Sequence, residues 1–132
     1  MKSGKPATLS DDTVVHRLGG KVLDNFQLQR SEEKLNPPGI SVLVGGTAKD
    51  AARTMLAVYD DPVGYPDIHA RSKRIASATI GEIRSQGFDV IANGTRRFPN
   101  HGRLIHPLGQ EGFASERLNS LVVVFREEEY ES

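Results

Sequence analysis

The fold is decided by residues 40–59, which read ISVLVGGTAKDAARTMLAVY. Apart from one serine, the first five residues are apolar or β-branched, which is typical of a buried central strand. Gly45-Gly46 ends this strand, and Thr47 with Asp50 forms a capping pair at the start of a helix. Apolar residues then recur along one helical face, at Ala48, Ala51, Ala52, Met55, Leu56 and Tyr59. A strand followed directly by a helix is therefore expected.

Further elements follow on both sides of this unit. Alternating or apolar runs predict strands at residues 14–18, 25–29, 88–92 and 101–106. Capping residues and apolar spacing predict helical segments at residues 31–35, 68–76, 79–87 and 115–125. The fold class expected is α+β, with a mixed α/β arrangement as the alternative. It would have one small sheet of about four to five strands, packed against two or three helices.

The length of 132 residues predicts one domain. Residues 1–12 are polar and predict a loose N-terminal arm, and residues 13–126 form the globular part. Residues 127–132 are expected to be an acidic tail that frays, because carboxylates oppose the dipole at the C-terminal end of a helix.

The composition excludes several classes of protein. The chain has no cysteine, so it has no disulfide, no thiolate metal site and no cysteine nucleophile. Its basic first residues are followed by no apolar run of signal-peptide length. Its longest apolar run, residues 121–125, is too short to span a bilayer. A cytoplasmic protein with no metal, cofactor or membrane partner is expected.

The net charge of zero conceals three blocks. Residues 1–68 carry a charge of −1, residues 69–106 carry +5 and residues 107–132 carry −4. The basic block predicts a surface for an anionic or protein partner, with the candidate residues Arg71, Arg74, Arg96, Arg97 and Arg103. The alternative is that the acidic tail neutralises this block within the fold.

The turn Gly45-Gly46-Thr47 is a candidate phosphate site, because backbone N–H groups at a helix start attract anions. The segment matches neither the dinucleotide fingerprint nor the P-loop pattern. A capped turn without a ligand explains the same residues and is favoured.

His101 and His106 are the candidate catalytic residues, since two imidazoles near several arginines suit phosphate recognition and acid–base chemistry. A metal-free ribonuclease could use such a pair. However, alternation along a strand would direct the two side chains to opposite faces, which also weakens a His–His metal site. A surface strand with one structural histidine is the alternative.

Another hypothesis combines distant residues into an NAD-dependent site. ADP-ribosyl-transfer folds commonly use an early Arg or His, a strand Ser or Thr and a later Glu. This chain offers His16-Arg17, Ser41 and either Glu82 or Glu111, although their spacing is not diagnostic.

Several short motifs occur in an order that resembles an uncharacterised family of small bacterial proteins. They are PPGISVL at 37–43, GGT at 45–47, GFDVI at 87–91, FPNH at 98–101, RLIHP at 103–107 and GF at 112–113. The resemblance covers roughly residues 16–126 and implies a standalone bacterial domain from toxin or mobile-element neighbourhoods. That family has no established activity, so no site residue is carried over. Where relatives often have proline after Val-Ile, this chain has Ala92.

Three functions remain in competition. The first is a protein-interaction or accessory domain in a conflict or secretion-linked system, because no convincing catalytic set is present. The second is a small toxin-like enzyme acting on RNA or NAD through the segment from Arg96 to His106. The third is non-catalytic nucleic-acid binding, in which residues 69–106 contact phosphates and Phe88, Phe98 or Tyr65 stacks on bases.

Overall fold

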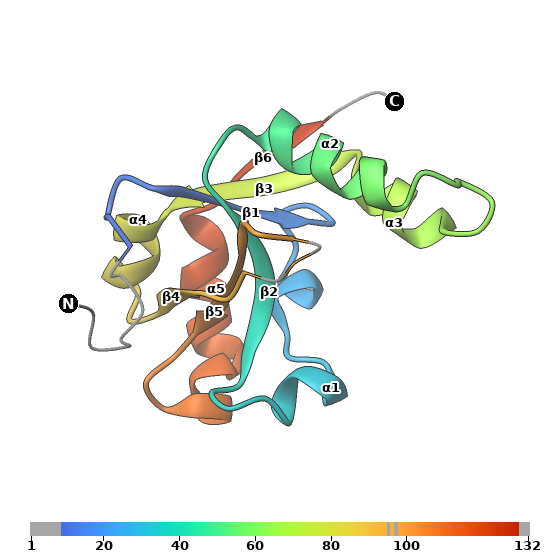
Figure 1. Cartoon of the computed structure of the whole chain (residues 1–132). Coiled ribbons are helices and arrows are strands. Elements are labelled where there is room, and N and C mark those ends of the chain that lie inside the picture. The colour runs from blue at the N-terminus through green and yellow to red at the C-terminus, as the bar shows by residue number, and fades with distance from the viewer. Residues whose placement is uncertain (1–8, 95, 97, 130–132) are drawn as a thin grey trace.

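The computed structural model describes residues 9–94, 96 and 98–129, and it has a mixed α+β fold, as expected. Its described part forms one antiparallel sheet of six strands, in the order β4-β5-β2-β1-β3-β6, which exceeds the expected four to five (Figure 1). The strands are β1 (Val14–Leu18), β2 (Gly39–Val44), β3 (Arg74–Thr79), β4 (Asp89–Ala92), β5 (His101–Ile105) and β6 (Arg126–Glu129).

Five α-helices and two short 3-10 helices are described around this sheet. They are α1 (Arg30–Glu33), α2 (Ala48–Val58), α3 (Pro66–Arg71), α4 (Ile80–Ser85), α5 (Ser115–Val123), η1 (Leu23–Phe26) and η2 (Gly109–Phe113). The strand–turn–helix unit expected from residues 40–59 is confirmed as β2 followed by α2.

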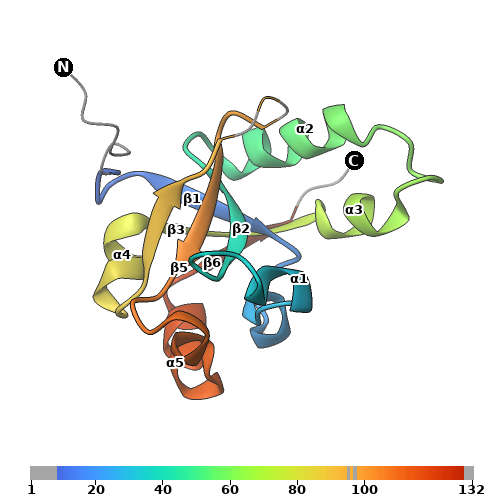
Figure 2. The same cartoon turned by 60° about the horizontal axis from the view of Figure 1, so that its bottom comes forward.

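The main core lies on the face of the sheet that packs against α4, α5 and η1. Figure 2 shows α5 on one side of the sheet and α2 on the other. Fully buried residues of this core are Val15, Phe26, Ile40, Ile80, Ile83, Leu104, Leu118, Leu121 and Phe125. Burying each large side chain contributes roughly 1.5–3 kcal/mol, so this face holds the two layers together.

The opposite face is covered over β1 and β3 by α2 and α3. Three small residues of α2, Ala48, Ala51 and Ala52, are buried there and form a second cluster with Leu18, Leu43 and Ile75. The helix approaches the sheet closely because alanine side chains are short.

Two expected elements are wrong. Residues 25–29 are not a strand, because the chain forms η1 and buries Phe26 against Phe125, with ring centroids 4.8 Å apart. The helix expected at residues 68–76 ends at Arg71, and the chain then enters β3. β3 lies between β1 and β6 in the sheet and pairs with both, and its small side chains are buried. This pairing overrides their weak strand preference.

Both ends of the globular part extend further than expected. Residues 9–12 are docked rather than loose: the Asp11 carboxylate pairs with Arg84, and the Asp11 carbonyl accepts a hydrogen bond from the Gly81 N–H. Residues 127–129 belong to β6 rather than to a frayed tail. Residues 1–8 and 130–132 lie outside the described residues.

The acidic tail does meet the basic block at one point. The Glu127 carboxylate pairs with Arg74 on the neighbouring strand and also accepts a hydrogen bond from the Lys21 backbone N–H. These contacts lower the pKa of Glu127, with the Lys21 hydrogen bond as the largest cause. At least one of the candidate arginines, Arg74, is therefore paired with an acidic residue of the same chain. In the described part of the chain, no helix is long and apolar enough to cross a membrane.

Candidate anion-binding cavity

The candidate site begins where two central strands separate. The β1–β2 ladder contains only the pairs Val15↔Val44 and His16↔Leu43. Beyond His16, β1 continues to pair with β3 as far as Leu18, while the earlier part of β2 pairs only with β5. The sheet therefore opens into a gap between the last residues of β1 and the first residues of β2.

Arg17 fills this gap. Its Nη1 donates to the Ser41 carbonyl at 2.8 Å, and its Nε donates to the Asn25 carbonyl at 3.0 Å. Arg17 is only 6% exposed, and burial lowers its pKa to about 10, so it stays charged at neutral pH. Among the described residues, no carboxylate lies within ion-pair distance of this guanidinium.

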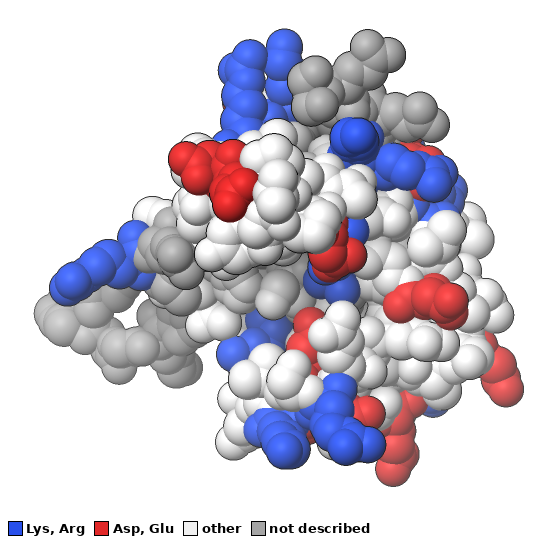
Figure 3. Space-filling model, turned by 90° about the vertical axis from the view of Figure 1, so that its right-hand side faces the viewer, with Lys and Arg blue, Asp and Glu red and all other residues white. Residues whose placement is uncertain are grey.

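A cavity of about 300 Å³ opens at the same place. Its polar wall contains Arg17, Ser41, Arg71, His16 and His101. Figure 3 shows a hollow in the face turned to the viewer, with Lys and Arg atoms inside it and Asp or Glu atoms beside them. Among the described residues, neither Asp nor Glu lines the cavity, so its electrostatic character is set by cations.

Arg71 is the second cation of the cavity. Its Nη2 donates to the Leu18 carbonyl at 3.3 Å and to the Asn25 Oδ1 at 3.4 Å. Its contact with Asp67, at 3.8 Å, involves a carboxylate that is 81% exposed. Solvent screens such an ion pair, so Asp67 compensates little of the charge.

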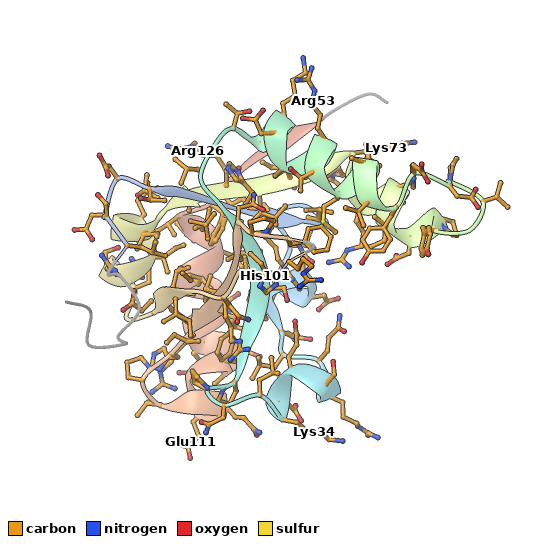
Figure 4. All side chains as sticks on the ribbon, viewed as in Figure 1. Lys34, Arg53, Lys73, His101, Glu111 and Arg126 are labelled. Carbon is orange, nitrogen blue, oxygen red and sulfur yellow. The ribbon has the colours of Figure 1, made fainter. Side chains whose placement is uncertain are left out.

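His101 and His16 line the cavity in different states of hydrogen bonding. His101 Nδ1 lies 3.2 Å from the Asn93 carbonyl and therefore carries a proton, which leaves Nε2 as the acceptor in the neutral ring. His16 uses both nitrogens, with Nδ1 2.7 Å from Ser77 Oγ and Nε2 3.0 Å from the Gly46 carbonyl. His101 is thus the histidine available for proton transfer, and Figure 4 shows it near the middle of the molecule.

His106 lies elsewhere. It lines an open groove of about 570 Å³ together with Arg117 and Ser120 of α5, whereas His101 lines the first cavity. The separation expected from strand alternation is confirmed, and the two histidines do not form one catalytic pair. The ring of His106 packs edge-on against Phe88, with centroids 4.7 Å apart, and its Nδ1 accepts from the Leu108 N–H.

The four candidate arginines that the structure describes do not line one cavity together. Arg71 lines the cavity, Arg74 pairs with Glu127, and Arg103 donates to the Pro37 carbonyl at 3.1 Å. Arg96 is exposed and lines neither cavity, and Arg97 lies outside the described residues. Of the described candidate arginines, only Arg71 therefore belongs to the cavity.

Two amides of the candidate phosphate turn, those of Gly45 and Thr47, have protein partners. The Gly45 N–H donates to the Val14 carbonyl at 2.7 Å, and the Thr47 N–H donates to Asp50 Oδ2 at 3.0 Å. The hydrogen bond from the Thr47 N–H is the largest cause that lowers the pKa of Asp50, which keeps a negative charge at this helix start. The geometry is that of the capped turn rather than of an anion site.

The residues of the ADP-ribosyl-transfer hypothesis are brought together in part. His16, Arg17 and Ser41 line the cavity, whereas the two candidate glutamates do not. Glu82 completes a capping box with Thr79 at the start of α4, and Glu111 lies in η2. Sequence reasoning did not associate Arg71, Met55 and Ile68 with these residues, since only the packing of α2 and α3 brings them here.

The free energy of unfolding is expected to fall as the pH is lowered through the region just below 6.5. Burial, as the largest cause, lowers the pKa of both His101 and His106 below their usual 6.5. The unfolded chain then binds more protons than the folded chain in this interval, so stability rises with pH across it and is fully present above it. Denaturant titrations between pH 5 and pH 8 should show this slope.

The matched variants are His101→Gln and His106→Gln, each of which should flatten the slope. Carboxylates with lowered pKa values, such as Glu82, lose their contribution only in more acidic solution, below their usual 4.5. If neither substitution changes the slope of the free energy of unfolding against pH, the assignment of that slope to His101 and His106 is contradicted.

Among the described residues, no group of three or more metal-binding side chains is arranged to hold a metal ion. Comparisons with models of protein families, with curated proteins and with solved structures give no match, so the family resemblance stays a prediction.

Proposed function

We propose that this chain binds a small, phosphate-bearing anion in the cavity between β1 and β2. The observation that carries the proposal is the buried guanidinium of Arg17, which has no carboxylate within ion-pair distance among the described residues. A buried charge costs several kcal/mol unless an opposite charge and hydrogen bonds compensate it. An anionic ligand would supply that compensation.

The cavity suits phosphate better than other anions. Arginine binds phosphate oxygens through paired N–H donors, and two arginines in a cavity whose described lining has neither Asp nor Glu favour a group with two or more negative charges. Its volume of about 300 Å³ lies at the small end of ligand pockets, which suits a pyrophosphate group or a nucleotide. His101 Nε2 offers a proton acceptor to such a ligand.

Anion binding in this cavity favours the enzymatic alternative over the protein-interaction and nucleic-acid-binding alternatives. A role in RNA or NAD chemistry would use the cavity, although the glutamate of the ADP-ribosyl-transfer hypothesis does not line it. Nucleic-acid binding by residues 69–106 is disfavoured, because Arg74 and Arg84 are engaged in ion pairs. The protein-interaction role stays a prediction.

The test is binding of inorganic pyrophosphate, measured by titration calorimetry. Wild-type protein should bind one pyrophosphate per chain, and Arg71→Met should weaken this binding by about tenfold or more, because a charge-assisted hydrogen bond is lost. The matched control is Arg96→Met, which removes an exposed cation that does not line the cavity. No binding to wild type, or equal loss in both variants, would contradict the proposal.

A further inference from the structure

We infer that the ligand is a nucleotide, whose uncharged base lies against Phe98 while its phosphates contact Arg17 and Arg71. This inference rests on the proposed anion binding and adds the chemical class of the ligand. It follows from the uneven distribution of apolar and charged side chains around the cavity.

The cavity has an apolar wall in addition to its cations. Met55 of α2, Ile68 of α3 and Phe98 of the loop between β4 and β5 all line it. Inorganic phosphate or pyrophosphate has no apolar part that could pack against this wall. A ligand that carries both an anionic group and a flat apolar ring would cover them and would use both parts of the cavity.

Phe98 is held in an orientation suited to stacking. Its ring is nearly parallel to that of Tyr59, with an interplanar angle of 23° and centroids 6.2 Å apart. Tyr59 in turn meets Tyr65 edge-on, at 4.9 Å. This row of rings joins the end of α2 to the loop that carries Phe98, so little side-chain freedom would be lost when a base stacks there.

The charges of the cavity select among bases. With Arg17 and Arg71 present and neither Asp nor Glu in the described lining, a positively charged pyridinium ring would add a third cation. An uncharged base such as adenine avoids this repulsion. The base is therefore expected to be neutral, and the phosphates are expected to carry the charge of the ligand.

The experiment compares ADP with pyrophosphate by calorimetry, in wild type and in the variants Phe98→Ala and Phe98→Tyr. Wild type should bind ADP at least tenfold more tightly than pyrophosphate. Phe98→Ala should weaken ADP binding by about fivefold to 100-fold and leave pyrophosphate binding unchanged, since stacking depends on the ring alone. Phe98→Tyr keeps the ring and should retain the affinity for ADP.

Further titrations test the charge of the base. AMP and nicotinamide mononucleotide each carry one phosphate, and AMP should bind more tightly. Equal binding of ADP and pyrophosphate to wild type would overturn the inference and leave the anion site intact. Equal weakening of both ligands by Phe98→Ala, or tighter binding of nicotinamide mononucleotide, would also overturn it. Failure of both ADP and pyrophosphate to bind would overturn the proposed function itself.

Discussion

Arg17→Met is expected to reduce pyrophosphate binding by at least 100-fold while changing the free energy of unfolding by no more than about 1 kcal/mol. The substitution removes a charge that is 6% exposed and has no carboxylate within ion-pair distance among the described residues. Relief of the desolvation cost offsets the loss of hydrogen bonds to the Asn25 and Ser41 carbonyls. Methionine fills a similar volume, so the gap between the strands stays packed.

The separation of binding from stability is the informative part of this result. A guanidinium that serves only to support the two strands would, when removed, destabilise the fold by several kcal/mol. Calorimetry and denaturant titration of the same sample measure both quantities. Arg17→Lys keeps the charge but not the paired donors, and it should show intermediate binding. Full pyrophosphate affinity in Arg17→Met would contradict the role of this residue.

Gly112→Ala is expected to destabilise the fold by about 1–3 kcal/mol, the usual range for an overpacked interior position. Gly112 is buried, and an added Cβ there would overlap the Cβ, Cγ and Nδ1 atoms of His106. These atoms lie close to the backbone, so the ring cannot turn aside easily. His106 is also packed against Phe88 and accepts a hydrogen bond from the Leu108 N–H.

A double-mutant cycle tests this cause directly. His106→Gly removes both the overlapping Cβ and the ring, so Gly112→Ala should cost much less in that background than in wild type. Denaturant titration of the four proteins yields the coupling free energy. Additive effects of the two substitutions on the free energy of unfolding would contradict the overlap between these residues as the cause. They would leave His106 open as a functional residue. Strong coupling would support its structural role in the groove beside α5.

The parts of the fold that depend on local patterns were predictable. Residues 40–59 carry a complete strand, turn, cap and helix, and the capping box at Thr79 marks the start of α4. The alternation of residues 101–106 was sufficient to separate the two histidines. In each case the physical cause lies within a few residues, where the sequence pattern can show it.

Other parts depend on distant residues. β3 is rich in alanine and serine, and it becomes a strand because β1 and β6 pair with it on both sides. β6 carries consecutive glutamates, which favour strands poorly, yet Glu127 finds Arg74 opposite. Phe26 lies in a run that alternates as a strand would, but the chain forms η1 there, and the Phe26 ring packs against Phe125 in the core.

The cavity was predictable only in pieces. His16, Arg17 and Ser41 could be selected by residue type, but their proximity follows from the early end of the β1–β2 ladder. Counting charges along the chain pointed to residues 69–106, whereas the buried cation without an ion pair among the described residues is Arg17, outside that block. Burial, and the absence of a carboxylate within ion-pair distance among the described residues, are tertiary properties that composition does not contain.

An NMR titration with ADP, followed in ¹H–¹⁵N and aromatic ¹H–¹³C spectra, tests the central claim most directly, because it locates binding on individual side chains. The account predicts saturable shifts of the Arg17 and Arg71 Nε–H signals and of the Phe98 ring protons, at one ADP per chain. The Nε–H signals of Arg74 and Arg96 should stay in place. Shifts confined to Arg74 and Arg96, or none with ADP at about 1 mM, would contradict it.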